Sequence, residues 1–172
     1  MTDRRFATCV AISLLVLTVA SRIVPHPWNF TPVIAVALFA GARLERTWLA
    51  LVAVSACMVL GDVALGVFPY EGIAWVYAPM LAITLIGRVL ETRRSIAATV
   101  VAALASGLVF FVVSNFGVWL GTLYPHSAAG LADCYVAALP FYRNQIIGDL
   151  MFTGALFGIH ALAVNLRVAA RV

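Results

Sequence analysis

Two carboxylates inside long apolar runs are the residues of this chain best suited to binding or proton chemistry. Asp62 lies within the apolar run 48–68, and Asp149 lies five residues into a second run, 144–168. A charged side chain in a membrane helix costs about 2.5 to 3.5 kcal/mol on insertion scales, so it is expected to face protein or water. Each aspartate follows a glycine, which also suits close helix packing. The pattern therefore predicts contacts to a ligand or a proton site, or else a structural hydrogen bond or salt bridge, for instance with Arg143.

Neutral polar and aromatic side chains form a second group of candidates. A buried Asn115 needs partners for both ends of its amide, so it either contacts a ligand or joins two helices. Small-molecule pockets are usually lined by aromatic rings with a few polar groups, although aromatic residues also collect at membrane interfaces. The predicted substrate-binding residues are Asp62, Asp149, Asn115, Asn144, Arg143, Trp28, Asn29, Trp75, Tyr77, Trp119, Tyr124 and Tyr135.

The composition indicates an integral membrane protein. Of the 172 residues, 64% are hydrophobic and 10% are charged, against about 45–50% apolar and about 25% charged in soluble domains. All eleven basic residues are arginines, and they stand singly or in pairs between apolar runs. Nucleic-acid binding would require a clustered basic surface, so we expect no nucleic-acid partner. The sequence predicts one integral membrane domain, residues 1–172, in contact with the lipid bilayer.

Six apolar segments are long enough to be transmembrane helices, since a span needs about 20 apolar residues and fewer where other helices shield it. The predicted helices are 6–24, 28–44, 48–68, 73–90, 96–123 and 144–168. The second contains an early proline and is predicted to start as a broken or unwound turn. The stretch 130–140 is too short to span and is predicted to be a short capping helix. It belongs to a loop, 124–142, that is predicted to act as a lid.

The arginines predict the orientation of this bundle. Nine of the eleven fall at alternate ends of the six predicted helices, and only Arg22 and Arg143 fall at the other ends. By the positive-inside rule the ends with nine arginines are cytoplasmic. We therefore expect both termini in the cytoplasm. Asp62 and Asp149 would then lie at comparable depth in the outer half and would converge on one outward-opening cavity.

Several enzyme classes lack their motifs in this chain. The sequence has no lysine, so it contains no GxxxxGK[ST] phosphate loop, and it has no GxSxG element. His26, His126 and His160 do not share a metal-binding spacing, and the three cysteines form no CxxC pair. We expect no catalytic residues, metal or cofactor. A membrane enzyme that uses Asp62 and Asp149 as an acid/base pair on a lipid is an alternative.

The order of five sequence blocks resembles a known family. The run PHPWNFTPVIAVALFAGA is followed by SNFGVW, YPHSAAGL, CYVAALPF and N-x-x-x-GD. These blocks resemble an uncharacterised bacterial family of transport proteins that is related to the S-components, the substrate-binding subunits, of energy-coupling factor (ECF) transporters. The resemblance extends over nearly the whole chain and implies an all-α bundle of six transmembrane helices with both ends inside. It also implies that the protein lies in the inner membrane of a bacterium.

The resemblance also implies a function. S-components capture vitamins and other micronutrients from outside the cell, and separate ATPase and scaffold subunits supply the energy. An Ala-x-x-x-Ala element on their first helix docks the scaffold, and Ala7 and Ala11 match it. We therefore expect uptake of a small vitamin-like or cofactor-precursor molecule, neutral or cationic, with an ECF module or as a solitary carrier. A structural or assembly subunit, whose polar residues only join helices, is the second alternative.

Overall fold

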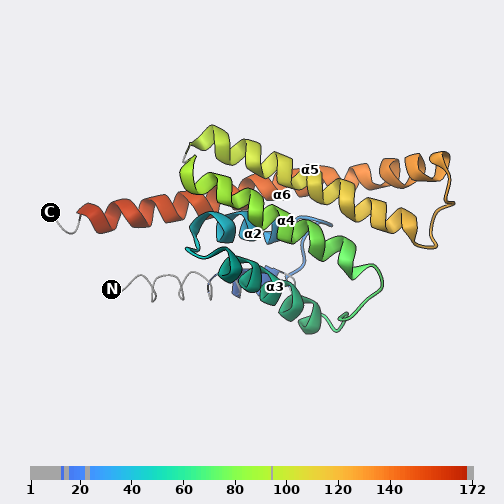
Figure 1. Ribbon diagram of the computed structural model, residues 1–172, viewed down its shortest axis with the longest axis horizontal. Coiled ribbons are helices and arrows are strands. Elements are labelled where there is room, and N and C mark those ends of the chain that lie inside the picture. The colour runs from blue at the N-terminus through green and yellow to red at the C-terminus, as the bar shows by residue number, and fades with distance from the viewer. Residues whose placement is uncertain (1–12, 14–15, 22–23, 94, 170–172) are drawn as a thin grey trace.

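The computed structural model describes residue 13 and residues 16–21, 24–93 and 95–169. All regular secondary structure in these residues is helical. Residues 16–21 are helical. Five helices follow, α2 (Val33–Arg43), α3 (Thr47–Ala64), α4 (Ile73–Thr92), α5 (Ile96–Leu120) and α6 (Ala128–Ala169). Figure 1 shows them lying lengthwise alongside one another. Most of the predicted first helix, 6–24, lies outside the described residues, as do Ala7 and Ala11.

Four of these helices are long and apolar enough to cross a membrane. They are α3, α4, α5 and α6, and each has few charged side chains along its apolar window. Large apolar side chains on their outer surfaces are exposed, for example Val52, Leu85, Val101 and Leu162. Apolar side chains on the outside of a bundle are expected where lipid is the solvent. The chain is therefore an all-α integral membrane protein.

Helix α2 lies at the centre of the bundle. It packs against α3, α4, α5 and α6, and every residue from Val33 to Ala42 is buried. A helix that is apolar all round has no face that prefers water, so it is stable in this buried position. Two glycines allow α2 and α4 to approach closely: a Cβ on Gly41 would overlap the carbonyl oxygen of Thr84, and a Cβ on Gly87 would overlap that of Leu38.

The second predicted span, 28–44, is only partly helical. Helix α2 has 11 residues, a length of about 17 Å, whereas the hydrocarbon core of a bilayer is about 30 Å thick. Before it, the amide of Phe30 donates to the Pro27 carbonyl at 3.0 Å and Asn29 has φ +60°, so this part is a turn. The predicted unwound start is confirmed, but α2 is too short to span the membrane by itself.

The largest difference from the sequence prediction concerns α6. The predicted capping helix, 130–140, and the predicted sixth helix, 144–168, are parts of one continuous helix of 42 residues. Pro140 lies inside it, where a break was expected. Membrane helices tolerate an internal proline because neighbouring groups satisfy the freed backbone carbonyl. The loop 124–142 is therefore not a separate lid: only residues 121–127 connect α5 to α6.

The helix connections gather at two ends of the molecule. The α2–α3 connection, the α4–α5 connection and the last turns of α6 lie toward the left of Figure 1. The α3–α4 and α5–α6 connections lie toward the right, which we call the opposite end. Arg43, Arg46, Arg88 and Arg93 belong to the first group, which we call the arginine-rich end. The predicted gathering of these arginines at one end is confirmed.

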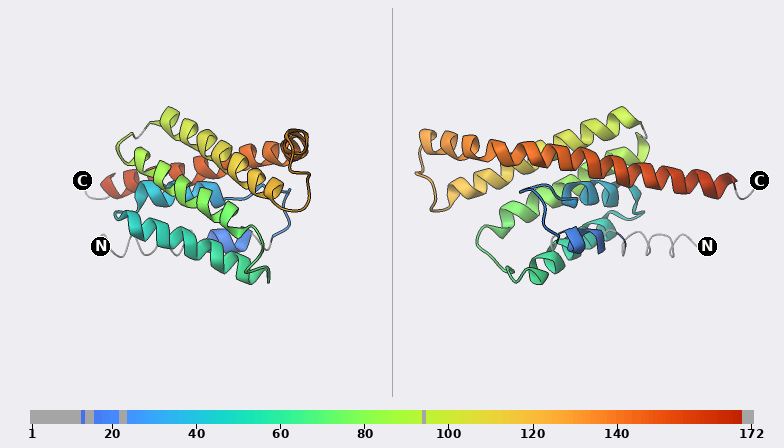
Figure 2. Two further views of the ribbon diagram at one scale, coloured as in Figure 1. Left: turned by 45° about the vertical axis from the view of Figure 1, so that its right-hand side comes forward. Right: turned by 180° about the vertical axis from the view of Figure 1, so that it is seen from behind.

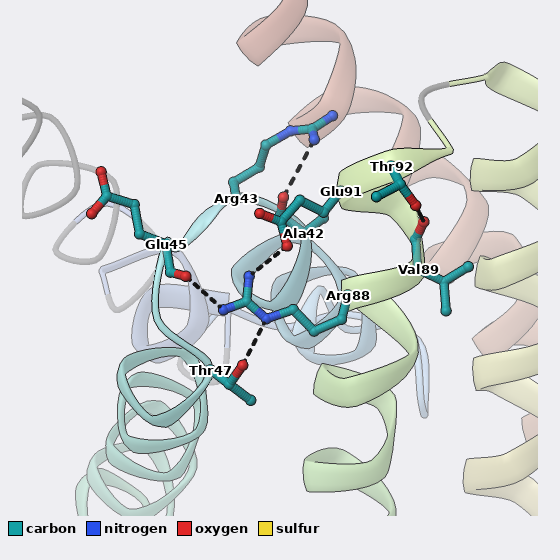
Figure 3. A network of polar contacts seen from close by, with 8 residues as sticks. All are labelled: Ala42, Arg43, Glu45, Thr47, Arg88, Val89, Glu91 and Thr92. Carbon is teal, nitrogen blue, oxygen red and sulfur yellow. Dashed lines mark hydrogen bonds and ion pairs between the residues drawn. The ribbon is translucent and has the colours of Figure 1, made fainter.

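Figure 3 shows how one of these arginines ties the arginine-rich end together. Arg88 on α4 donates to the Thr47 hydroxyl at 3.1 Å and to the Glu45 carbonyl at 3.0 Å, and it pairs with Glu91 at 3.2 Å. A single guanidinium therefore joins the end of α4 to the start of α3.

Candidate functional site

A cavity of about 540 Å³ lies on the side of the bundle centre that faces the opposite end. Its lining comes from the non-helical segment before α2, the first turn of α2, and one or two residues of α3 to α6. The lining residues are His26, Trp28, Asn29, Thr31, Val33, Ile34, Met58, Leu65, Val76, Met80, Phe110 and Gln145. We call it the central cavity. Its volume is within the range of about 300 to 1,000 Å³ that is usual for small-molecule sites.

The non-helical segment 24–32 supplies four of these residues because it is fixed against α6. The Phe30 ring packs on Phe152 with ring centres 5.4 Å apart. Gly148 leaves room for this approach, since a Cβ there would lie 3.3 Å from the Phe30 ring. Irregular backbone at membrane depth is tolerated where it is buried in protein or lines a cavity. Because residues 24–32 are not helical, α2 is short, and the same non-helical residues line the central cavity.

A second, smaller cavity of about 300 Å³ adjoins the first. It shares Trp28, Asn29, Phe110 and Gln145 with the central cavity. Its remaining lining comes from α5 and α6: Phe111, Ser114, Asn115, Val118, Ala138 and Phe141. Trp28 is 77% exposed and makes an edge contact with Phe141 at 6.1 Å between ring centres. We call this the side cavity, and Trp28 stands where both cavities open.

Gln145 is the buried polar group common to both cavities. Its side chain is 3% exposed, and its amide nitrogen donates to the Gly107 carbonyl on α5 at 2.9 Å. The same nitrogen lies 3.4 Å from an oxygen of Asp149, one turn later on α6. Gly107 makes room for this carboxylate, because a Cβ there would be 2.7 Å from it. Asp149 therefore holds a position behind Gln145, against α5.

Asp62 is held by a different partner. Its side chain is buried near the end of α3, and the hydroxyl of Tyr77 on α4 donates to it at 2.7 Å. Helices α3 and α6 are not in contact anywhere in the described residues, since α2 packs between them. Neither Asp62 nor Asp149 lines the central cavity or the side cavity, so the structure does not bring the two acids together at either one. Asp62 joins α3 to α4 through Tyr77, whereas Asp149 lies beside Gln145 on its own helix and packs against Gly107 of α5. Met58 and Gln145, one turn earlier than the two acids, line the central cavity.

The predicted aromatic residues separate into two groups. Trp28 lines both cavities with Asn29, and Asn115 lines the side cavity while its amide donates to the Phe111 carbonyl at 2.8 Å. Three others hold the helices together: Trp75 packs against Gly117, Trp119 donates to the Pro125 carbonyl at 3.1 Å, and Tyr135 donates to the Val112 carbonyl at 2.6 Å. Tyr124, Arg143 and Asn144 line neither cavity.

Sequence reasoning did not select His26, Thr31, Phe110 or Gln145 as binding residues, although all four line the central cavity. For the first two, the signal was present: three prolines within 25–32 mark an irregular segment. Gln145 stands beside Asn144 in a polar pair that could point inward or face solvent, and the sequence does not decide between the two. Phe110 could not be found from the sequence, because its helix is apolar on every side and the sequence does not show which side faces inward.

The lining of both cavities is uncharged in the described part of the chain. The polar side chains there are those of His26, Asn29, Thr31, Ser114, Asn115 and Gln145, with aromatic rings beside them. Amide and hydroxyl groups offer donors and acceptors without a net charge. No group of three or more histidine, cysteine or acidic side chains that could hold a metal is found in residues 13, 16–21, 24–93 and 95–169. This arrangement suits a neutral ligand with a ring.

The chain belongs to a protein family of unknown function, DUF6580, which matches residues 2–171. No curated protein and no solved structure matches it.

Proposed function

We propose that the protein is a substrate-binding membrane subunit that captures a small, neutral, vitamin-like or cofactor-precursor molecule for uptake. The observation that carries this proposal is the central cavity, which has the size of a ligand site and an uncharged lining of rings and amides. Trp28 would stack on the ligand at the opening, and Asn29 and Gln145 would bond its polar edge. The described lining contains no carboxylate or guanidinium that could pair with a charged ligand, which supports a neutral ligand over a cationic one.

The orientation is part of the same proposal. The arginine-rich end would face the cytoplasm, because the positive-inside rule places arginine-bearing connections there. The central cavity would then open toward the outside, where uptake begins. ECF-type scaffold and ATPase subunits would supply the energy, and Ala7 and Ala11 are the proposed scaffold contacts.

A structural or assembly subunit is the second candidate, and one set of contacts favours it. The buried Asp62 and Gln145 and the half-buried Asn115 all have hydrogen-bond partners within the protein. Such bonds join helices without any ligand. The lipid enzyme has less support, because its acid/base pair would have to form between helices that α2 separates.

A thermal-shift screen tests the leading proposal. The purified protein in detergent is heated with neutral vitamins, nucleobases and their precursors, and with charged analogues of each. A ligand at about 100 times its dissociation constant adds about 2.7 kcal/mol to the folded state. We expect at least one neutral compound to raise the unfolding midpoint, and its charged analogue to have less effect. Stabilisation by charged analogues only, or by no compound, would favour the structural candidate.

A further inference from the structure

A groove on the outer surface lies between α5 and α6, away from the cavities described above. The two helices touch where Gln145 reaches Gly107, and they separate toward the arginine-rich end, as Figures 1 and 2 show. Arg43 at the end of α2 and Leu90 near the end of α4 line the resulting groove of about 430 Å³. Its other lining residues are Ser95, Ile96, Thr99, Val100, Ala103, Leu150, Thr153, Gly154, Phe157, Gly158 and Ala161. We call it the α5–α6 groove.

The groove opens to the surroundings of the bundle rather than into its core. Ile96 is 86% exposed on one wall, and Val100 and Leu150 are also exposed. On the α6 wall, a Cβ added at Gly154 or at Gly158 would meet nothing within 4 Å. In a membrane, the molecules beside such a surface are lipids or other helices.

Four polar side chains line this apolar groove, and two of them, Ser95 and Thr99, bond to the backbone at the start of α5. The other two are Arg43 and Thr153. The Arg43 guanidinium lies over the Phe157 ring at 5.1 Å, and one of its nitrogens donates to the Ala42 carbonyl at 3.3 Å. Thr153 is 2% exposed, and its hydroxyl has no hydrogen-bond partner. Thr153 precedes Phe157 by one helical turn, so it is about 6 Å farther from the arginine-rich end. A buried hydroxyl without a partner is unusual and suggests that a partner arrives from outside the protein.

The arginine-rich end carries the kinds of side chain that proteins place at the level of the lipid headgroups. Trp48, exposed at the start of α3, is the kind of side chain that concentrates at a membrane interface. Four arginines, Arg43, Arg46, Arg88 and Arg93, stand near two glutamates in the described residues at this end, and Arg88 pairs with one of them. Figure 3 shows the Arg43 guanidinium turned toward α6, away from the contacts of Arg88. The positive charge beside the groove would attract an anion.

The shape of the groove suits a hydrocarbon chain. Its α5 wall from Ile96 to Ala103 is about 11 Å long. The groove volume of about 430 Å³ and its mostly apolar lining leave room for an extended acyl chain beside the polar groups of Arg43 and Thr153.

We propose that the α5–α6 groove binds an anionic phospholipid. Its phosphate would accept hydrogen bonds from Arg43, whose planar fork of donors suits phosphate oxygens. The ester group one turn deeper would accept from the Thr153 hydroxyl, and an acyl chain would continue along Ala103 and Leu150 toward the bilayer centre. Basic pockets between membrane helices on the cytoplasmic side are known lipid headgroup sites.

The test measures unfolding midpoints in detergent with added phosphatidylglycerol, with phosphatidylcholine of the same chains, or with inorganic phosphate. We expect phosphatidylglycerol to stabilise the wild type most and inorganic phosphate not to stabilise it. Gly154→Leu adds a side chain to the groove lining at a position where a Cβ meets nothing within 4 Å, and it should weaken phosphatidylglycerol binding about tenfold or more. Ala155→Leu, on the same helix but outside the groove lining, should bind as the wild type does. Arg43→Gln should bind the two lipids equally.

Three results would overturn the proposal. One is a phosphatidylglycerol effect that survives in Gly154→Leu, and another is equal stabilisation of the wild type by both lipids. A third is a change in the mass of the detergent-solubilised protein in Gly154→Leu without a change in lipid binding, which would identify the groove as a contact for a helix. Because Gly154→Leu leaves Arg43 in place, the test does not depend on the folding of Arg43→Gln.

Discussion

At the residue scale, the two buried aspartates act mainly as contacts between helices. Asp62 accepts from Tyr77, which ties α3 to α4, and Asp149 lies beside Gln145, which bonds to α5. A buried carboxylate is costly unless hydrogen bonds satisfy it, so the short bond from Tyr77 helps to explain how Asp62 persists in an apolar helix. Gln145 differs from the two aspartates because it also faces the central cavity.

The Tyr77 contact gives a prediction at this scale. Tyr77→Phe removes the hydroxyl that donates to Asp62 and leaves the ring in place. Since a buried acceptor that loses its donor costs about 1 to 3 kcal/mol, the unfolding midpoint should fall accordingly. The affinity for a cavity ligand should be unchanged, because neither side chain lines the central cavity. Titration of both proteins with the same ligand checks this, and a loss of affinity without a loss of stability would place Tyr77 in the binding site instead.

At the element scale, the packing of α2 against α4 decides the shape of the bundle. Gly41 and Gly87 bring the two backbones together, and α2 in turn keeps α3 apart from α6. The packing of α2 against α4 therefore also keeps Asp62, on α3, apart from Asp149, on α6.

A methyl group added at the contact between α2 and α4 should lower the stability of the fold. Gly41→Ala places a Cβ against the Thr84 carbonyl, and overpacking of this kind costs about 1 to 3 kcal/mol or more. Gly154→Ala is the matched control, since it adds the same methyl group on α6 where nothing lies within 4 Å. We expect a large drop in the unfolding midpoint for the first variant and none for the second. Equal midpoints would show that α2 and α4 are not in close contact.

Much of the element plan could be predicted from the sequence, and the failures have physical causes. Helix α4 begins at the predicted residue, Ile73, as does α5 at Ile96, because Gly72 with φ +79° and the Ser95 cap mark those starts. Pro140 and the polar stretch after it were interpreted as a break, yet α6 runs through both. The cavity lining was only partly predictable, since Trp28, Asn29 and Asn115 were selected but Phe110 was not.

At the scale of the whole molecule, the two ends have different chemistry. The arginine-rich end carries most of the charge, in contacts such as that of Arg88 with Glu91. The opposite half contains the central and side cavities, whose described lining is uncharged. Such a division suits a protein that stands in a fixed orientation in a bilayer and receives a neutral molecule from one side.

The measurement that tests the central claim most directly is calorimetric titration of the most stabilising ligand from the screen into two tryptophan variants. Leu65 and Leu60 lie on or next to α3 with similar exposure, 45% and 47%, but only Leu65 lines the central cavity. Tryptophan at 65 should fill the cavity, whereas tryptophan at 60 should face lipid. We predict that Leu65→Trp loses binding and that Leu60→Trp binds as the wild type does. Undiminished binding to Leu65→Trp would contradict the assignment of the central cavity as the ligand site.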